Sequence, residues 1–159
     1  MSRVITIAVI LAAFCVPAEA QTLMVTVLNE AGAQIVLKAA EESARQKSAP
    51  SAIAVVDPAG DLLAFQRMDG VRPDSVDLAI QKARTAARLR RSTAAIEDSI
   101  DHGRTAFVTA GIAALRGGVP VLLDGQVLGA VGVAGLNKDT DTAISETAAM
   151  SLAATAKTP

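Results

Sequence analysis

Residues 119–133, VPVLLDGQVLGAVGV, decide the fold that this chain can adopt. Two apolar runs, 119–123 and 126–133, lie on either side of Asp124-Gly125, which is the strongest short turn signal in the sequence. Valine and leucine suit the half-buried surface of a sheet. We therefore predict two antiparallel strands joined by a tight turn.

The second of these runs is rich in glycine, with Gly129, Gly132 and Gly135 spaced at intervals of three. A nucleotide-binding loop needs its glycines where a strand passes into a helix, whereas these lie along one arm of a hairpin. Glycine inside a strand marks a bulge, or the close approach of another backbone or of a ligand. We expect one of these and no phosphate-binding loop.

The segments around this hairpin predict a second hairpin and four helices. Apolar periodicity and turn residues place the hairpin at 51–56 and 62–68, and the helices at 28–47, 74–90, 92–102 and 139–156. Asn29 is expected to cap the first helix, Asp74 or Ser75 the second, and Asp139 or a neighbour the last. An extra strand is expected near 107–115. The order predicts one α/β (α+β) domain, with an antiparallel sheet covered by helices.

Residues 1–20 predict a secretory signal peptide. A basic start, an apolar stretch at 4–16 and the small-residue ending Ala18-Glu19-Ala20 form its three expected parts. Cleavage near Ala20/Gln21 leaves a single domain, 21–159, in the periplasm or secreted. The apolar stretch is shorter than the roughly 20 residues of a membrane span, so no stable membrane insertion is expected.

Composition excludes several classes of function. The chain of 159 residues has 15 basic and 16 acidic side chains and a formal net charge of -1, which does not favour nucleic acid as a partner. Aromatic residues make up 2%, without Trp or Tyr, so stacking sites for bases or sugars are not expected. One Cys and one His cannot form an ordinary zinc site.

The densest charge lies at 82–91, KARTAARLRR. This run suits an exposed helix face near the negative helix end, and it equally suits the binding of ligand carboxylates. His102 has two readings as well: a solvated helix end, or an axial ligand to a metal or haem. The carboxylates Asp98, Asp101, Asp139 and Asp141 lie near helix ends, where capping and solvation explain them.

Five motifs in collinear order carry a family resemblance. They are IAVVD at 53–57 followed by Gly60, RMDG at 67–70, Ser75 followed by KARTA at 82–86, GGVPV at 117–121 and DGQVLGAVGVAG at 124–135. Each is weak alone, but together they span about 28–152 and are specific. On these motifs the chain resembles the GlcG/HbpS family, which includes the C-terminal domain of PduO-type proteins.

The resemblance implies a three-layer α/β/α sandwich around a central antiparallel sheet of about five strands, and homo-oligomers from dimers to octamers. Relatives bind haem or related tetrapyrroles, so haem is the expected cofactor. The matching positions imply a pocket formed by Met68, Asp69, Lys82, Thr85, Gly117 and Gly118. The resemblance also makes Arg84 and Arg88 candidates for the propionates, and His102 or Thr85 for the iron side.

Three functions remain open at this point. The first is an exported haem- or tetrapyrrole-binding protein without turnover, in haem or iron handling or in redox sensing. The second is an enzyme acting on a small organic acid or a haem-derived compound, with Lys82, Arg84 and Thr85 holding a carboxylate. The third is an accessory subunit of a periplasmic oxidoreductase. The residues give no catalytic constellation that assigns turnover.

Overall fold

The computed structural model describes residues 25–156, so the predicted signal peptide at 1–20 lies outside the described residues. In chain order the elements are α1 (Glu30–Gln46), β1 (Ala52–Val56), β2 (Leu62–Arg67), α2 (Asp74–Leu89), α3 (Thr93–Asp101), the 3₁₀ helix η1 (Thr105–Thr109), β3 (Gly118–Leu123), β4 (Gln126–Ala134) and α4 (Lys138–Ala156). Within 25–156 no helix is both long enough and apolar enough to cross a membrane.

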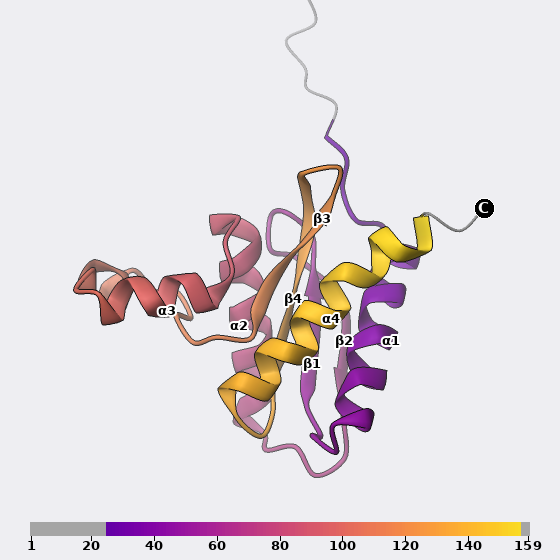
Figure 1. Ribbon diagram of the computed structural model, residues 1–159, viewed down its shortest axis with the longest axis horizontal. Helices are drawn as coiled ribbons and strands as arrows, with labels where there is room; N and C mark the ends of the chain where they lie inside the picture. The colour runs from indigo at the N-terminus through magenta and orange to yellow at the C-terminus, as the bar shows by residue number, and fades with distance from the viewer. Residues whose placement is uncertain (1–24, 157–159) are drawn as a thin grey trace, which may run out of the picture.

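The strands form one antiparallel sheet in the order β2-β1-β4-β3. Helices α1 and α4 lie against each other on one face, and α2 covers the other (Figure 1). The predicted three-layer α/β/α sandwich and both hairpins are therefore confirmed. The described sheet has four strands where about five were expected.

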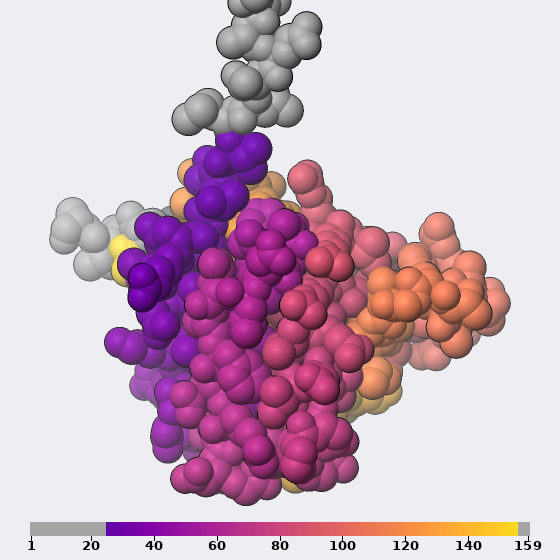
Figure 2. All heavy atoms as spheres, turned by 180° about the vertical axis from the view of Figure 1, so that it is seen from behind, coloured from indigo at the N-terminus to yellow at the C-terminus, as the bar shows by residue number. Residues whose placement is uncertain are grey.

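The predicted strand near 107–115 is wrong. This segment contains η1 and then a turn at Gly111, where φ is +66°. Two of its large apolar side chains are exposed to solvent, Val108 by 67% and Leu115 by 50%. Together with α3 the segment forms an arm that projects from the body of the molecule, so it has no strand to pair with (Figures 1 and 2).

Two of the three predicted helix caps are confirmed, those of α1 and α4. Asn29 accepts a hydrogen bond from the Gly32 N–H at 2.9 Å, and Ser92 caps α3. Asn137, two residues before Asp139, caps α4 by accepting from the Thr140 N–H. The prediction for α2 is wrong, because Pro73 occupies the cap position and Asp74 and Ser75 already lie in the first turn, which leaves this helix without a side-chain cap.

The two faces of the sheet differ in side-chain size. On β1, Ile53 and Val55 face α1 and α4, whereas Ala52 and Ala54 face α2. On β4, Gly132 pairs with Ala54 and likewise faces α2. Small residues on this face let α2 lie unusually close to the sheet.

Glycine makes that close approach possible. A Cβ built on Gly132 would clash with the Ala79 carbonyl oxygen and lie 2.5 Å from the Ala83 nitrogen. A Cβ on Gly118 would clash with the backbone of Lys82. The expected approach of a second backbone is thus confirmed at Gly132, and that backbone belongs to α2.

We predict that Gly132→Ala forces α2 away from the sheet and lowers the free energy of unfolding by about 1–3 kcal/mol, the usual cost of overpacking a core. Urea denaturation measures the change. Gln126→Ala, at an exposed position of the same strand, serves as the control and is expected to leave stability within about 0.5 kcal/mol. A Gly132→Ala midpoint equal to the wild-type midpoint contradicts the close packing described above.

Candidate functional site

Three of the predicted site residues come together on the outer side of α2. Arg84, Thr85 and Arg88 line a cavity of about 370 Å³ between this helix and the end of the arm. We call it the arginine pocket; its lining comprises Gln81, Arg84, Thr85, Arg88, Leu89, Gly111, Ile112 and Ala113. The helix repeat brings residues four apart onto one face, which is why residues 81, 84, 85 and 88 meet here.

Backbone carbonyls of the turn between β1 and β2 hold the two arginines in place. Arg84 donates from Nε to the Gly60 carbonyl at 3.0 Å, and Arg88 donates from Nε to the Ala59 carbonyl at 2.7 Å. Gly60 has φ +91°, and a Cβ there would lie 2.8 Å from the Arg88 Nε. Among residues 25–156 the Nη atoms of both arginines have no hydrogen-bond or ion-pair partner. Two oriented guanidinium groups therefore keep donors available for an anion.

Thr85 connects the helix to the arm. Its side chain is buried, and its hydroxyl accepts a hydrogen bond from the Ala113 N–H at 3.0 Å. Ala113 is itself buried, in contrast to most of the arm before it. This bond fixes one wall of the arginine pocket and leaves the hydroxyl with a proton to donate.

Lys82 lies on a different side of α2 from this pocket. It is 2% exposed, and its Nζ donates to the Val133 carbonyl at 2.8 Å and to Asp141 Oδ2 at 3.0 Å. Its neighbours on the helix, Ala79 and Ala86, are buried too. The amino group is thus already bound within the protein and joins α2 to α4.

Asp141 is the residue that sequence reasoning missed. It is 4% exposed, not solvated, and its Oδ1 has no hydrogen-bond partner among the described residues. Burial raises the pKa of Asp141. This effect outweighs the lowering of the pKa by the Lys82 ammonium and by the nearby Gly135 N–H. The sequence did contain a signal for this residue. Lys82 lies among the alanines of α2 that face the sheet, and a buried ammonium requires a buried acidic partner.

Gly117 and Gly118 frame this ion pair. Gly117 has φ +113°, and a Cβ there would approach the Val133 carbonyl oxygen at 2.7 Å and both Lys82 and Asp141 at 3.0 Å. Gly118 donates its N–H to the Thr93 hydroxyl at 2.8 Å. The two glycines therefore leave room for the Lys82–Asp141 pair at the start of β3.

The remaining predicted site residues lie apart from the arginine pocket lining. Met68 is partly buried, and its sulfur accepts from the Ser51 N–H at 3.4 Å, whereas Asp69 is exposed. His102 lies exposed at the end of α3, as predicted, with Nδ1 2.6 Å from the Asp98 carbonyl oxygen. Within 25–156 no group of three or more His, Cys, Asp or Glu side chains could hold a metal ion.

An ion-pair network fixes the base of the arm. Arg116 pairs with Glu97 and Asp98, and Lys138 contacts Glu97 at 3.3 Å. Burial on its own would raise the pKa of Glu97, but hydrogen bonds and charge from Arg116 and Lys138 lower it. The carboxylate of Glu97 thus stays charged and ties α3 to the start of α4.

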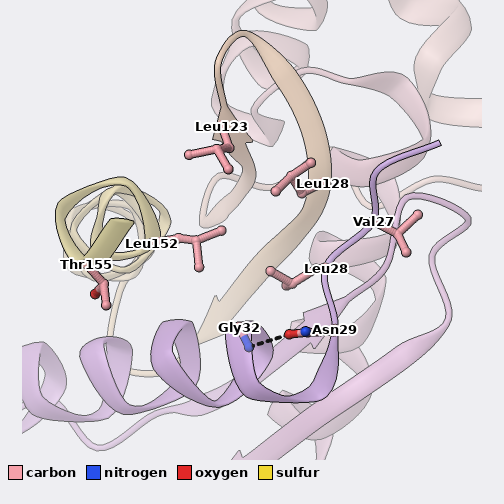
Figure 3. A pocket seen from close by; sticks show the side chains of 8 residues that line it. All are labelled: Val27, Leu28, Asn29, Gly32, Leu123, Leu128, Leu152 and Thr155. Carbon is pink, nitrogen blue, oxygen red and sulfur yellow. Dashed lines mark hydrogen bonds between the residues drawn. The ribbon is translucent and has the colours of Figure 1, made fainter. Parts of the chain in front are cut away.

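A separate hollow of about 280 Å³ lies where the N-terminus of α1 meets the C-terminal end of α4 and the β3–β4 hairpin (Figure 3). Leu28, Leu123, Leu128 and Leu152 point toward one another across it, and Asn29 is turned to its capping bond with Gly32. Its polar groups are few and already engaged in part, so it offers apolar surface and no charged group.

We predict that Lys82→Met lowers the free energy of unfolding at pH 7 by about 3–5 kcal/mol, because a buried carboxylate loses its cation. The double variant Lys82→Met/Asp141→Leu should recover most of this loss, since no charge is then buried. Denaturant titration of the three proteins provides the comparison, and a double variant no more stable than the single one contradicts the pairing.

The same variant gives a pH test. Because burial raises the pKa of Asp141, its proton contributes stability that is fully present below the ordinary Asp pKa and is lost as pH rises through the raised value. Without Lys82 that pKa rises further, so the destabilisation by Lys82→Met should be smaller at pH 4.5 than at pH 7. An equal loss at both pH values would show that Asp141 does not control the effect.

Taken together, the fold and the pocket define an α/β/α domain with a pair of arginines aimed into a surface cavity. A family model described as haem degrading protein HbpS-like matches residues 28–150. The chain belongs to this HbpS-like family.

Individual relatives agree with this assignment. Protein GlcG of Escherichia coli strain K12 is 45% identical over 108 residues, which are 67% of this chain and 81% of GlcG. The crystal structure of Klebsiella pneumoniae protein ORFY is 30% identical, with a TM-score of 0.79 over 86% of this chain and 97% of that one. The crystal structure of a PduOC:heme complex is 26% identical, with a TM-score of 0.67 over 74% of this chain and 89% of that one.

Proposed function

We propose that this protein binds haem or a related tetrapyrrole through the arginine pocket. The observation that carries the proposal is the pair Arg84 and Arg88, fixed by the carbonyls of the β1–β2 turn and with Nη donors available at the wall of a cavity. Charge-assisted bonds from guanidinium to carboxylate are among the strongest in proteins. The PduOC:heme complex supports the choice of ligand class.

The residues present fit the carboxylate edge of such a ligand. Arg84 and Arg88 would hold the propionates, and Leu89 and Ile112 supply apolar surface for the ring. The cavity of about 370 Å³ lies at the lower end of ligand pockets, which suits an edge-on ligand that stays partly exposed. Thr85 supplies the hydroxyl in the lining, and bound iron would supply redox chemistry there.

Hemin titration tests the proposal. We expect the wild-type protein to shift and sharpen the Soret band at stoichiometric hemin. Arg84→Gln and Arg88→Gln should each weaken hemin binding about tenfold, the loss of one charge-assisted bond of roughly 1.4 kcal/mol. Arg45→Gln removes the same charge from α1 on the opposite face of the sheet and should bind as the wild type does.

Unfolding temperatures of all variants check that the turn at 59–60 remains folded. Arg84 and Arg88 also support that turn, so the Gln variants change both its support and the charge. Arg84→Lys and Arg88→Lys are therefore measured as well, because they retain the charge. An unchanged Soret band in the wild type, or equal weakening by Arg45→Gln, contradicts the proposal.

A second candidate function is the binding or conversion of a small organic acid at the same pocket. Its support is the size of the cavity, which would enclose a small carboxylate more fully than a tetrapyrrole. A carboxylate that competes with hemin, and an activity lost in Arg84→Gln but kept in Arg45→Gln, would favour this function. Competition without any turnover would leave binding alone.

We further propose that the mature protein is exported to the periplasm or secreted, acts in haem or iron handling or in redox sensing, and assembles into a homo-oligomer. Support for export is the predicted signal peptide at 1–20.

Support for assembly is the apolar surface at Leu122 and Met150, whose side chains are 48% and 66% exposed. Cell fractionation, with light scattering of the purified protein, tests both; co-purification with an oxidoreductase would instead indicate an accessory subunit.

A further inference from the structure

The opposite end of α2 carries a second cavity that the proposed function does not use. It has a volume of about 370 Å³ and lies between the loop after β2, the first turn of α2 and the end of β4. We call it the serine pocket; its lining is Pro50, Gly70, Val71, Arg72, Ser75 and 135–136. It shares no residue with the arginine pocket.

Ser75 is the unusual group in this pocket. The residue is 3% exposed, yet among residues 25–156 its hydroxyl has no hydrogen-bond partner. The hydroxyl is not sealed inside the protein either, because Asp141 Oδ1 is the only enclosed polar side-chain atom without a partner in that part of the chain. The hydroxyl therefore reaches the cavity with its proton available to a ligand.

The start of α2 adds a favourable field. This helix of 16 residues has no side-chain cap, and its Ser75 and Val76 N–H groups donate to the Arg72 and Pro73 carbonyls at 3.2 Å. A helix N-terminus carries a partial positive charge that attracts anions. In most helices a capping side chain supplies the oxygen, and here that position is held by Pro73, which has none.

The pocket has a cation and a fixed rim. Arg72 lines it with a side chain 74% exposed, held only by a loose contact of 3.7 Å to Asp74. Arg67 donates two hydrogen bonds, of 3.1 and 2.6 Å, to the Val71 carbonyl and so fixes the loop. Gly70 at φ +82° leaves open space where a side chain would project.

From these features we propose that the serine pocket is a binding site for a small oxyanion, a phosphate or a carboxylate. Ser75 Oγ donates to the anion, the first turn of α2 faces it, and Arg72 exchanges its loose contact with Asp74 for the ligand. Arg72 attracts the anion, whereas the exposed Asp69 and the first-turn residues Asp74 and Asp77 oppose its binding. Salt screens the attraction by Arg72, so part of the salt dependence of binding should come from this side chain.

Titration of ¹⁵N-labelled protein with inorganic phosphate, and separately with acetate, tests the site. Chloride at equal ionic strength is the control for screening. The amides of residues 70–76 and 135–136 should shift with phosphate, acetate or both, and not with chloride; which of the two binds assigns the ligand. Identical shifts with chloride would overturn the proposal.

Variants separate a binding role from a structural one. Ser75→Ala should weaken anion binding about tenfold, while the unfolding temperature without anion does not fall, because the hydroxyl bonds no other group of the described residues. Arg72→Gln should weaken binding and reduce its salt dependence, and Arg45→Gln should change neither. Wild-type anion affinity in Ser75→Ala, or a lower unfolding temperature without anion, would overturn the proposal.

Discussion

The approach of α2 to the bare backbone of β3 and β4 is the constraint on which the rest of the molecule depends. At Gly118 and Gly132 no side chain separates the helix from the sheet, so the helix axis is fixed relative to both hairpins. Protein interiors are close-packed and tolerate little change in volume, which makes this contact rigid. Both pockets lie at ends of α2 and take their shape from it.

The Lys82–Asp141 pair extends this contact to the third layer. Lys82 leaves α2 on one face of the sheet and meets Asp141 of α4, which covers the other face. The pair is costly to bury, since burial raises the pKa of Asp141 despite the nearby ammonium. Its position at Gly117, where the arm rejoins the sheet, suits a register-setting contact better than a ligand site.

Local signals in the sequence predicted the hairpins, the helices and two of the three capping residues named for them, because turn chemistry and apolar periodicity act over a few residues. They failed at 107–115, where β-branched and apolar residues face solvent on an arm. They also failed at Asp141, whose burial depends on Lys82, 59 positions away. The resemblance placed Arg84, Thr85 and Arg88 together. A binding role for Ser75, in contrast, could be inferred only from the cavity that it lines.

The most direct measurement is an amide map of the protein with zinc protoporphyrin, a diamagnetic analogue whose ring current reports position. If α2 presents its C-terminal half to a tetrapyrrole, the amides of 81–89 and 111–113 shift together and those of α1 stay unchanged. Shifts confined to the hollow around Leu28 and Leu152, with none along α2, would contradict a tetrapyrrole site at the arginine pocket.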